Sequence, residues 1–443
     1  MNDRFDERLR AHLATMDTVE VAGADALGAG VARSQRRHER TRRAALGGTV
    51  AALLVAGSLV VWNAGGGPER VTSGDGGAPT TVAESVTPAT TVMSTIPPTT
   101  ADLGGSPWAA VPPGPRTGVS GATVVWTGTE AVAFGGQSVA EIAGIDAGVD
   151  AYDPLSAQWR SVSTEVPLLA PILVWTGDTI LAVGWTTTGA PRSVAATLSL
   201  ESGVWTILAD APAPDKLWSA DPWVWTGSEL LVMSGDEGLD AATAQAFNPT
   251  TNEWRTLPSA PLAPRYHAAS VWTGDEWLIW GGGDGSNDFA DGVAYNPTTD
   301  AYRPLAASIL SNRRVPGVWT GTEMIVLGGV SGGDPTGNGE MAMSDGAAYN
   351  PVSNTWRSTR PGFAHPGFVP VWTGSLIVQF AKGGAVWYDP AADEWSSGDM
   401  TFGEVSHEDS SPVWTGTMVI FLGSYDGSTG GATFTPPDVS PAA

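Results

Sequence analysis

The sequence contains no cysteine and little positive charge beyond its N-terminal end. Without cysteine, the chain has no disulfide framework, no thiolate nucleophile and no cysteine-ligated metal site. Residues 1–43 hold nine of the 22 basic residues and seven of the 46 acidic ones, so the remaining chain carries 13 − 39 = −26. Such a domain repels phosphate backbones. We therefore expect no nucleic-acid partner, whereas cations and basic proteins fit the charge.

Charged residues of either sign are also scarce, at 15% of the 443 residues. In contrast, the chain contains 56 glycines, 33 prolines and 20 tryptophans. So many turn-forming residues do not fit a mainly helical protein. The composition favours an all-β fold with a large core.

One uncharged and mostly apolar run lies near the N-terminus, over residues 44–62. As a helix, its 19 residues span about 28 Å, close to the hydrocarbon thickness of a bilayer. Five arginines lie between residues 36 and 43, and the first charge after the run is Glu69. The positive-inside rule then predicts a single-pass cell-membrane helix with residues 1–43 in the cytoplasm and the rest outside. Cleavage as a twin-arginine export signal is the alternative, although no A-x-A site follows.

The segments on either side of this run have different compositions. Residues 63–106 are rich in Gly, Pro, Thr and Ser and lack regular apolar patterning, so we expect an extended linker. In the cytoplasmic tail, one face of a short amphipathic helix is predicted by four apolar residues at spacings of four, four and three: Phe5, Leu9, Leu13 and Met16. That face can dock a cytoplasmic protein. The alternative is a helix that rests on the inner membrane surface or stays frayed.

An internal repeat decides the expected fold. The tetrapeptide Val-Trp-Thr-Gly recurs seven times at intervals of 42 to 53 residues. Its tryptophans are Trp126, Trp175, Trp225, Trp272, Trp319, Trp372 and Trp414. In the fourth unit, strands are expected at 268–272, 277–280, 292–296 and 301–305. Four antiparallel strands in about 47 residues are one propeller blade, so we predict a seven-bladed β-propeller over residues 107–436, followed by a short tail at 437–443.

The two ends of the repeat explain how the ring closes. The seventh unit has three strands, whereas residues 107–112 precede the first unit and have the pattern of a fourth strand. We expect this N-terminal strand to complete the C-terminal blade, because closure removes two unpaired edges.

Between the third and fourth units, a further set of residues follows a fixed order. An aromatic residue begins a proline-ended strand at 254–258, Arg265 and His267 follow, and the next strand pair ends at Gly281-Gly282. This order resembles the kelch family, with departures at 184–185, 234–235 and 379–380. The resemblance implies a kelch-like propeller. Such propellers include copper oxidases with a cysteine–tyrosine cofactor, which this sequence excludes, and sialic-acid mutarotases, which leave a sugar isomerase as an alternative.

The tryptophans have two expected roles. Those at the repeated positions are predicted to fill the wedges between blades, where burial of an indole is strongly favourable. Four others fall outside those positions and are candidates for exposed contacts: Trp185, Trp218, Trp223 and Trp387.

The connections after the second and fourth strands vary in length, which is typical of a binding face. Counting back from the repeated tryptophans predicts that seven residues converge at the channel mouth on this face: Trp218, Arg265, His267, Arg314, His365, His407 and Asp409. They would form a mixed-charge pocket for a glycan, peptide or anion. The alternative is that these groups are solvated or bonded to blade backbone.

One acidic loop, residues 284–291, places oxygen ligands at alternate positions as Ca²⁺ loops do. It lacks the later Glu and the glycine spacing of such loops, so we expect an ordinary Gly-Asp turn, no metal site and no cofactor. The sequence also has no Ser-His-Asp spacing, paired catalytic carboxylates or phosphate loop.

Three functions are consistent with these features. The first is a non-catalytic binding module on the outer surface, for protein or glycan. The second is a carbohydrate-active enzyme at the channel mouth. The third is a transmembrane sensor that signals through residues 1–43.

Overall fold

The computed structural model describes residues 107–436 apart from 116–118, 121, 136, 139–147, 165–166, 187–191, 212–216, 218–220, 235–241, 333–339, 363–368, 382–383, 400–410 and 423–429. These residues belong to one compact unit, residues 51–443. The predicted tail (1–43), transmembrane helix (44–62), linker (63–106) and C-terminal tail (437–443) lie outside them. Within the described part of the chain, no helix has the length and apolar character needed to cross a membrane.

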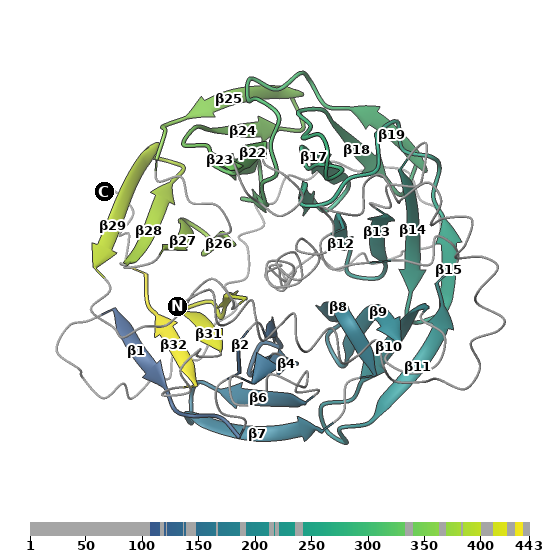
Figure 1. Ribbon diagram of the computed structural model, residues 1–443, viewed down its shortest axis with the longest axis vertical. Coiled ribbons are helices and arrows are strands. Elements are labelled where there is room, and N and C mark those ends of the chain that lie inside the picture. The colour runs from purple at the N-terminus through teal and green to yellow at the C-terminus, as the bar shows by residue number, and fades with distance from the viewer. Residues whose placement is uncertain are drawn as a thin grey trace, which may run out of the picture. The chain divides into compact units, whose positions relative to one another are not determined.

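Seven four-stranded antiparallel sheets are arranged as a ring (Figure 1), which confirms the predicted seven-bladed β-propeller. Blade 1 consists of β3 (Thr123–Trp126), β4 (Ala131–Phe134), β6 (Val149–Asp153) and β7 (Gln158–Ser163). Blade 2 consists of β8 (Leu168–Trp175), β9 (Ile180–Thr186), β10 (Ser193–Leu198) and β11 (Trp205–Asp210). Blade 3 consists of β12 (Trp223–Trp225), β13 (Leu230–Ser234), β14 (Thr243–Asn248) and β15 (Glu253–Thr256).

The remaining blades follow the same plan. Blade 4 consists of β16 (Ala269–Trp272), β17 (Trp277–Trp280), β18 (Gly292–Asn296) and β19 (Ala301–Pro304). Blade 5 consists of β20 (Gly317–Trp319), β21 (Met324–Leu327), β24 (Gly346–Asn350) and β25 (Thr355–Thr359). Blade 6 consists of β26 (Val371–Trp372), β27 (Ile377–Ala381), β28 (Gly384–Asp389) and β29 (Glu394–Asp399). Blade 7 consists of β30 (Val413–Trp414), β31 (Val419–Leu422), β32 (Gly431–Phe434) and β1 (Trp108–Val111). Two further strand pairs lie outside the blades. Strand β2 (Val119–Ser120), before the first strand of blade 1, pairs with β5 (Gln137–Ser138) between its second and third strands, and the hairpin β22–β23 (Val330–Gly332 with Glu340–Ala342) connects the second and third strands of blade 5.

The ring closes where the sequence predicts. The N-terminal strand β1 pairs antiparallel with β32, Trp108 opposite Phe434 and Val111 opposite Gly431. Both Trp108 and Val111 are buried. Contacts between β30 and β3 then join blade 7 to blade 1. The first and last strands of the fold therefore complete one blade together.

The seven repeated turns share one geometry, which explains why the tetrapeptide is repeated. In blade 4, Thr273 N donates to Glu276 O (3.0 Å) and Thr273 Oγ1 accepts from Glu276 N (2.8 Å). The glycine of each turn has a φ between +97° and +111°, a region that side chains disfavour. The side of the ring that carries these turns is called the turn face below. The opposite side, which carries the connections between second and third strands, is called the loop face.

The core lies between neighbouring sheets. Leu231 of blade 3 and Trp277 of blade 4, for example, belong to one buried cluster. Among the repeated tryptophans, Trp126 is buried, and the others are partly buried and pack against the edges of such clusters.

The expectation that Trp223 is exposed is wrong, because it is 7% exposed. Trp223 and Trp225 lie two residues apart in β12, so both side chains point to the same core. Trp185 and Trp387 are partly buried, and Trp218 lies outside the described residues.

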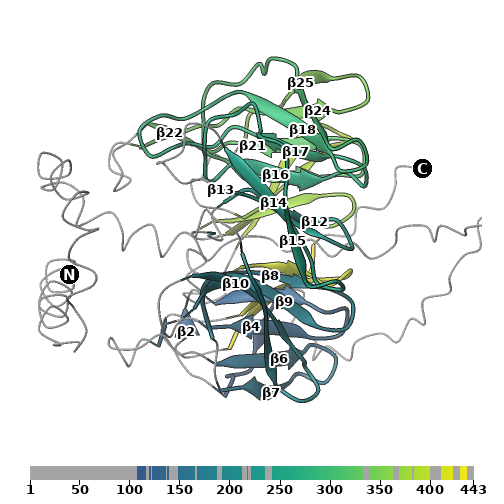
Figure 2. The ribbon, with the colours of Figure 1, turned by 90° about the vertical axis from the view of Figure 1, so that its right-hand side faces the viewer.

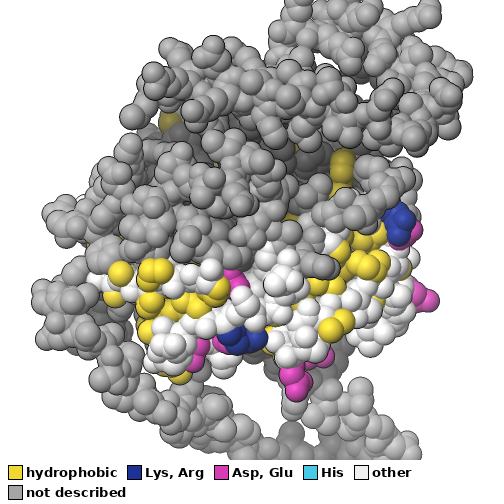
Figure 3. Space-filling view, turned by 60° about the horizontal axis from the view of Figure 1, so that its bottom comes forward, with side chains coloured by type: hydrophobic (Ala, Val, Ile, Leu, Met, Phe, Trp, Pro, Cys, Tyr) yellow, Lys and Arg dark blue, Asp and Glu magenta, His cyan; other side chains and the backbone are white. Residues whose placement is uncertain are grey.

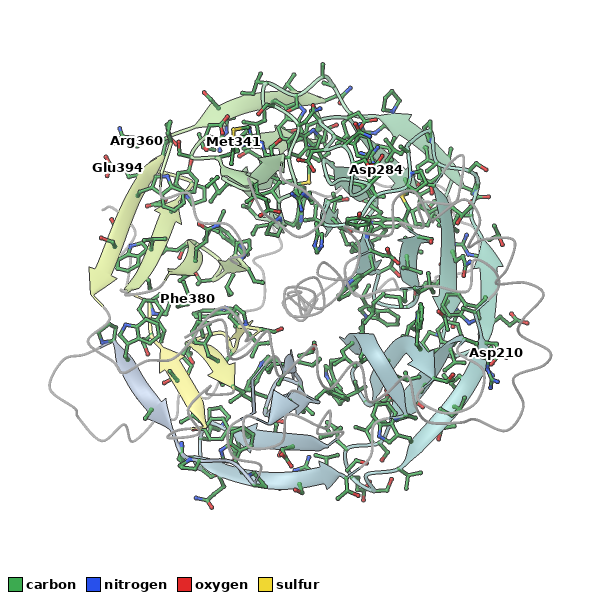
Figure 4. All side chains as sticks on the ribbon, viewed as in Figure 1. Asp210, Asp284, Met341, Arg360, Phe380 and Glu394 are labelled. Carbon is green, nitrogen blue, oxygen red and sulfur yellow. The ribbon has the colours of Figure 1, made fainter. Side chains whose placement is uncertain are left out.

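Neighbouring blades are joined at the rim by a repeated pair of hydrogen bonds, called the rim clasp below. Trp356 Nε1 of blade 5 donates to Ala306 O (3.0 Å), and Asn354 Oδ1 accepts from Ala306 N (2.9 Å). Ala306 lies two residues after the end of the outer strand of blade 4. The same pair is formed by Trp254 and Asn252 on Ala209, and by Trp395 and Asp393 on Arg360. Arg360 and Glu394 mark this last junction in Figure 4.

Two ion pairs lie on the part of the rim formed by blades 1 and 2. Arg160 contacts Glu130, and Arg192 contacts Asp210. In the view of blades 7, 1 and 2 in Figure 3, basic groups lie next to acidic ones among scattered hydrophobic atoms. The rim shown there has no continuous charged patch.

Candidate functional site

The structure describes three of the seven residues predicted to converge at the channel mouth. Arg265, His267 and Arg314 lie on the loop face of blades 4 and 5. The other four, Trp218, His365, His407 and Asp409, lie outside the described residues. Convergence of the full set therefore stays a prediction.

Arg265 is completely buried and holds the double-glycine corner of blade 4. Its Nη1 donates to Gly281 O (3.0 Å) and to Asp291 Oδ1 (2.9 Å), and its guanidinium lies 4.4 Å from the centre of the Phe289 ring. This is the backbone-bonded alternative described above. Because no part of the side chain faces solvent, Arg265 supports the blade and is not available to a ligand.

Arg313 plays the same part in blade 5, and sequence reasoning missed it. It is also fully buried, and it donates to Gly328 O (3.1 Å) and to Asp345 Oδ1 (2.8 Å). It lies six residues before Trp319, whereas Arg265 lies seven before Trp272. A count of seven residues back from Trp319 therefore misses Arg313, and the count of five reaches Arg314, the next residue along the chain.

Arg314 connects the loops of two blades. Its Nε donates to Asp288 Oδ1 in the blade 4 loop (3.0 Å), and its Nη2 donates to Glu340 Oε1 in the β22–β23 hairpin of blade 5 (2.8 Å). The side chains of all three are mostly covered, with 21%, 11% and 24% exposure for Arg314, Asp288 and Glu340. Charge-assisted hydrogen bonds of this kind are stronger than those at exposed pairs.

The same groups bind the backbone of one residue of the hairpin. Gly332, at the end of β22, donates its N–H to Asp288 Oδ2 (2.8 Å) and accepts from Arg314 Nη2 on its carbonyl (3.0 Å). The backbone of Arg314 also forms two hydrogen bonds with Val330. The β22–β23 hairpin, which stands out from the ring beside the loop face in Figure 2, is thereby fixed to blades 4 and 5 together.

His267 lies beside this connection with a φ of +55°. Its carbonyl accepts a hydrogen bond from Val315 N (3.1 Å), which links blades 4 and 5 through the backbone. Burial, and then the nearby Arg314 charge, lower the pKa of His267 to about 4. The imidazole is therefore neutral at pH 7 and adds no positive charge to the loop face.

The carboxylates of the 284–291 loop have separate partners. Asp284 Oδ1 accepts from Ser286 N (2.8 Å) and Asn287 N (2.7 Å), as in an Asx turn, and Asp284 is marked in Figure 4. These backbone hydrogen bonds lower the pKa of Asp284 against the opposing effect of burial. Asp288 faces Arg314 and Asp291 faces Arg265. Within the described ranges, no three His, Asp or Glu side chains come together as metal ligands.

The loop face of blades 4 and 5 is negative toward solvent even though its charges are paired. The side chains of Asp291 and Asp345 are 59% and 49% exposed, whereas their partners Arg265 and Arg313 are 0% exposed. The cationic half of each pair is hidden and the anionic half is displayed. Arg313 also lowers the pKa of Asp345 through its hydrogen bond, so this carboxylate stays ionised.

The chain matches no protein-family profile and no curated protein. Its assignment as a seven-bladed propeller rests on the sheets themselves, and its function must be argued from the loop face.

Proposed function

We propose that this chain is a membrane-anchored, extracytoplasmic propeller of kelch-like type that acts as a non-catalytic binding module for protein or glycan. The observation that carries the proposal is the contrast between the two faces. Seven uniform Thr-Gly turns occupy one face, whereas the other carries longer connections, one of which is an ordered hairpin held by Arg314. Variable loops on a rigid frame are where binding is usually found.

Paired charges support binding over catalysis. Arg314, Asp288 and Glu340 satisfy one another, and His267 is neutral. A general acid or base at neutral pH needs a pKa near 7 and access to substrate. The described part of the loop face offers shape and charge for recognition, and its arginines act as supports.

A binding experiment tests this proposal. The full-length chain, purified in detergent, is applied to arrays of glycans and of extracytoplasmic proteins. We expect a specific ligand whose binding is weakened by Arg314→Ala on the loop face. The matched control is Arg357→Ala, which removes an arginine paired with Glu323 (2.6 Å) on the turn face. Equal loss in both variants would contradict a loop-face site.

The membrane topology is tested separately, using the natural absence of cysteine. Val352 is 95% exposed, so Val352→Cys should react with a membrane-impermeant maleimide on intact cells. Ser34→Cys, in the predicted cytoplasmic tail, should react only after lysis. The reverse pattern would place the propeller inside the cell.

A further inference from the structure

Within the described residues, the β22–β23 hairpin has one open edge, which lies on the loop face. Strand β23 (Glu340–Ala342) pairs with β22, and no other strand of the described residues pairs with it. The N–H and C=O groups along an open edge can accept another extended chain. Such an edge supplies the main-chain hydrogen bonds of a peptide-binding site.

The hairpin is fixed before any partner arrives. Gly332 is held at both its N–H and its carbonyl by Asp288 and Arg314, and Glu340 is held by Arg314. A strand that is already ordered loses less conformational entropy on binding than a free loop. Arg314 is thus a positioning residue for this edge.

The side chains beside the edge indicate what kind of chain fits. Met341 is 61% exposed and offers a flexible apolar contact; it is marked in Figure 4. Asp345, three residues beyond β23, displays a carboxylate whose arginine partner, Arg313, is buried. Opposite charge on a partner is favoured at such a surface, and like charge is disfavoured.

We propose that β23 is the docking strand for an extended, lysine- or arginine-rich segment of a partner protein. This inference rests on the proposed binding function and names the partner class. The segment adds as a further strand to the hairpin, its apolar side chains contact Met341, and its basic side chains face Asp345. The excess of 39 acidic over 13 basic residues beyond residue 43 favours the same partner at long range.

The test uses two labelled synthetic peptides of twelve residues, one alternating Thr and Lys and the other alternating Thr and Glu. Each is titrated with the full-length chain in detergent by fluorescence anisotropy. We expect the lysine peptide to bind, with affinity that falls as salt rises, and the glutamate peptide not to bind. Equal binding of both peptides, or of neither, would overturn the proposal.

Matched variants place the site. Met341→Arg puts a positive charge beside the edge and should weaken binding of the lysine peptide about tenfold or more, which is about 1.4 kcal/mol. Val352→Arg adds the same charge to the turn face, at a residue that is 95% exposed, and should change binding less than about twofold. Equal effects of the two variants would show that only overall charge matters and would refute a site at β23.

Hydrogen exchange separates strand addition from other modes of binding. The lysine peptide should increase amide protection at residues 340–342 and leave the turn face unchanged. Binding without protection there would refute strand addition while leaving a binding function intact. A glycan ligand whose affinity is unchanged by Met341→Arg would likewise assign recognition to other loops. Failure of every array and both peptides would remove the proposed function itself.

Discussion

Replacement of Trp108 by alanine tests whether the N-terminal strand closes the ring. Trp108 is 2% exposed, and its ring centre lies 4.7 Å from that of Phe434, 5.8 Å from that of Phe380 and 6.2 Å from that of Phe421. Large-to-small substitution of a buried tryptophan costs about 3 to 5 kcal/mol. Since domains of this kind have total stabilities of about 5 to 15 kcal/mol, Trp108→Ala should remove about a fifth or more of the free energy of unfolding.

The measurement is urea unfolding of the full-length chain in detergent, followed by circular dichroism at pH 7. The control is Val352→Ala, which should change the free energy of unfolding by less than about 0.5 kcal/mol because Val352 is 95% exposed. In hydrogen exchange, residues 431–434 should lose more protection than residues 277–280, because β32 loses its outer neighbour. A change below about 1 kcal/mol for Trp108→Ala would refute closure through β1.

Three other substitutions follow from single contacts, and each is measured by urea unfolding. Asn354→Ala should cost about 1 to 2 kcal/mol, because Asn354 accepts from Ala306 N (2.9 Å) and Tyr349 Oη (2.6 Å) at a φ of +52°; no loss would mean that the rim clasp does not stabilise the ring. Tyr302→Phe should be neutral or stabilise by up to about 1 kcal/mol, because the Tyr302 hydroxyl is buried without a hydrogen-bond partner; a clear loss would contradict this. The pKa of His267 is about 4 in the folded chain, against an ordinary value of 6.5. Between these two pH values the unfolded chain binds a proton at His267 that the folded chain does not bind, so the free energy of unfolding should fall by about 1 to 3 kcal/mol as pH drops from 6.5 to 4. His267→Asn should reduce that slope, and an unchanged slope would contradict it.

The strands of the propeller are predictable because the repeat carries local signals. In blade 4 the predicted and observed strands agree within one residue at every end, since glycine turns stop each strand. Pairing of residues 108–111 with the last strand follows from counting strands alone. Burial of Trp223 was not predictable from the repeat position, although its two-residue spacing from Trp225 contains the signal.

The loop face is less predictable, because its contacts join residues of different blades. Arg314 meets Asp288 and Glu340, each 26 residues away in opposite directions along the chain. Neither distance matches the repeat interval, so comparison of the units does not reveal the connection. The one-residue offset between Arg265 and Arg313 also hides their common role. A fixed count back from the repeated tryptophan cannot distinguish the buried Arg313 from its partly exposed neighbour, Arg314.

At two junctions of the rim, a proline removes the backbone N–H that the clasp needs. In a complete clasp, the backbone N–H belongs to the residue four positions after the aromatic residue of the preceding outer strand, as Ala306 follows Tyr302. The corresponding residues before blades 1 and 4 are Pro112 and Pro258, which have no N–H. Blade 1 has Ala157 at the position of Asn354, and it keeps only the Trp159 Nε1 bond to Pro112 O (2.9 Å). Blade 2 has Gly203 at this position, although the facing residue, Ser163, is not a proline. In blade 4, Asp300 accepts instead from Tyr295 Oη (2.6 Å), and Tyr302 replaces the donor indole.

Where proline removes the donor, the facing side chain has no backbone N–H from which to accept a hydrogen bond. The clasp consequently acts as a unit of two residues on one blade and one on the next. The junction between blades 3 and 4 lacks the Asx bond and has tyrosine in place of the donor indole. Two other hydrogen bonds join these blades, from Arg255 Nη1 to Tyr295 Oη (3.3 Å) and from Ser270 Oγ to Trp223 O (2.9 Å), beside the closely packed core that includes Trp277 and Leu231.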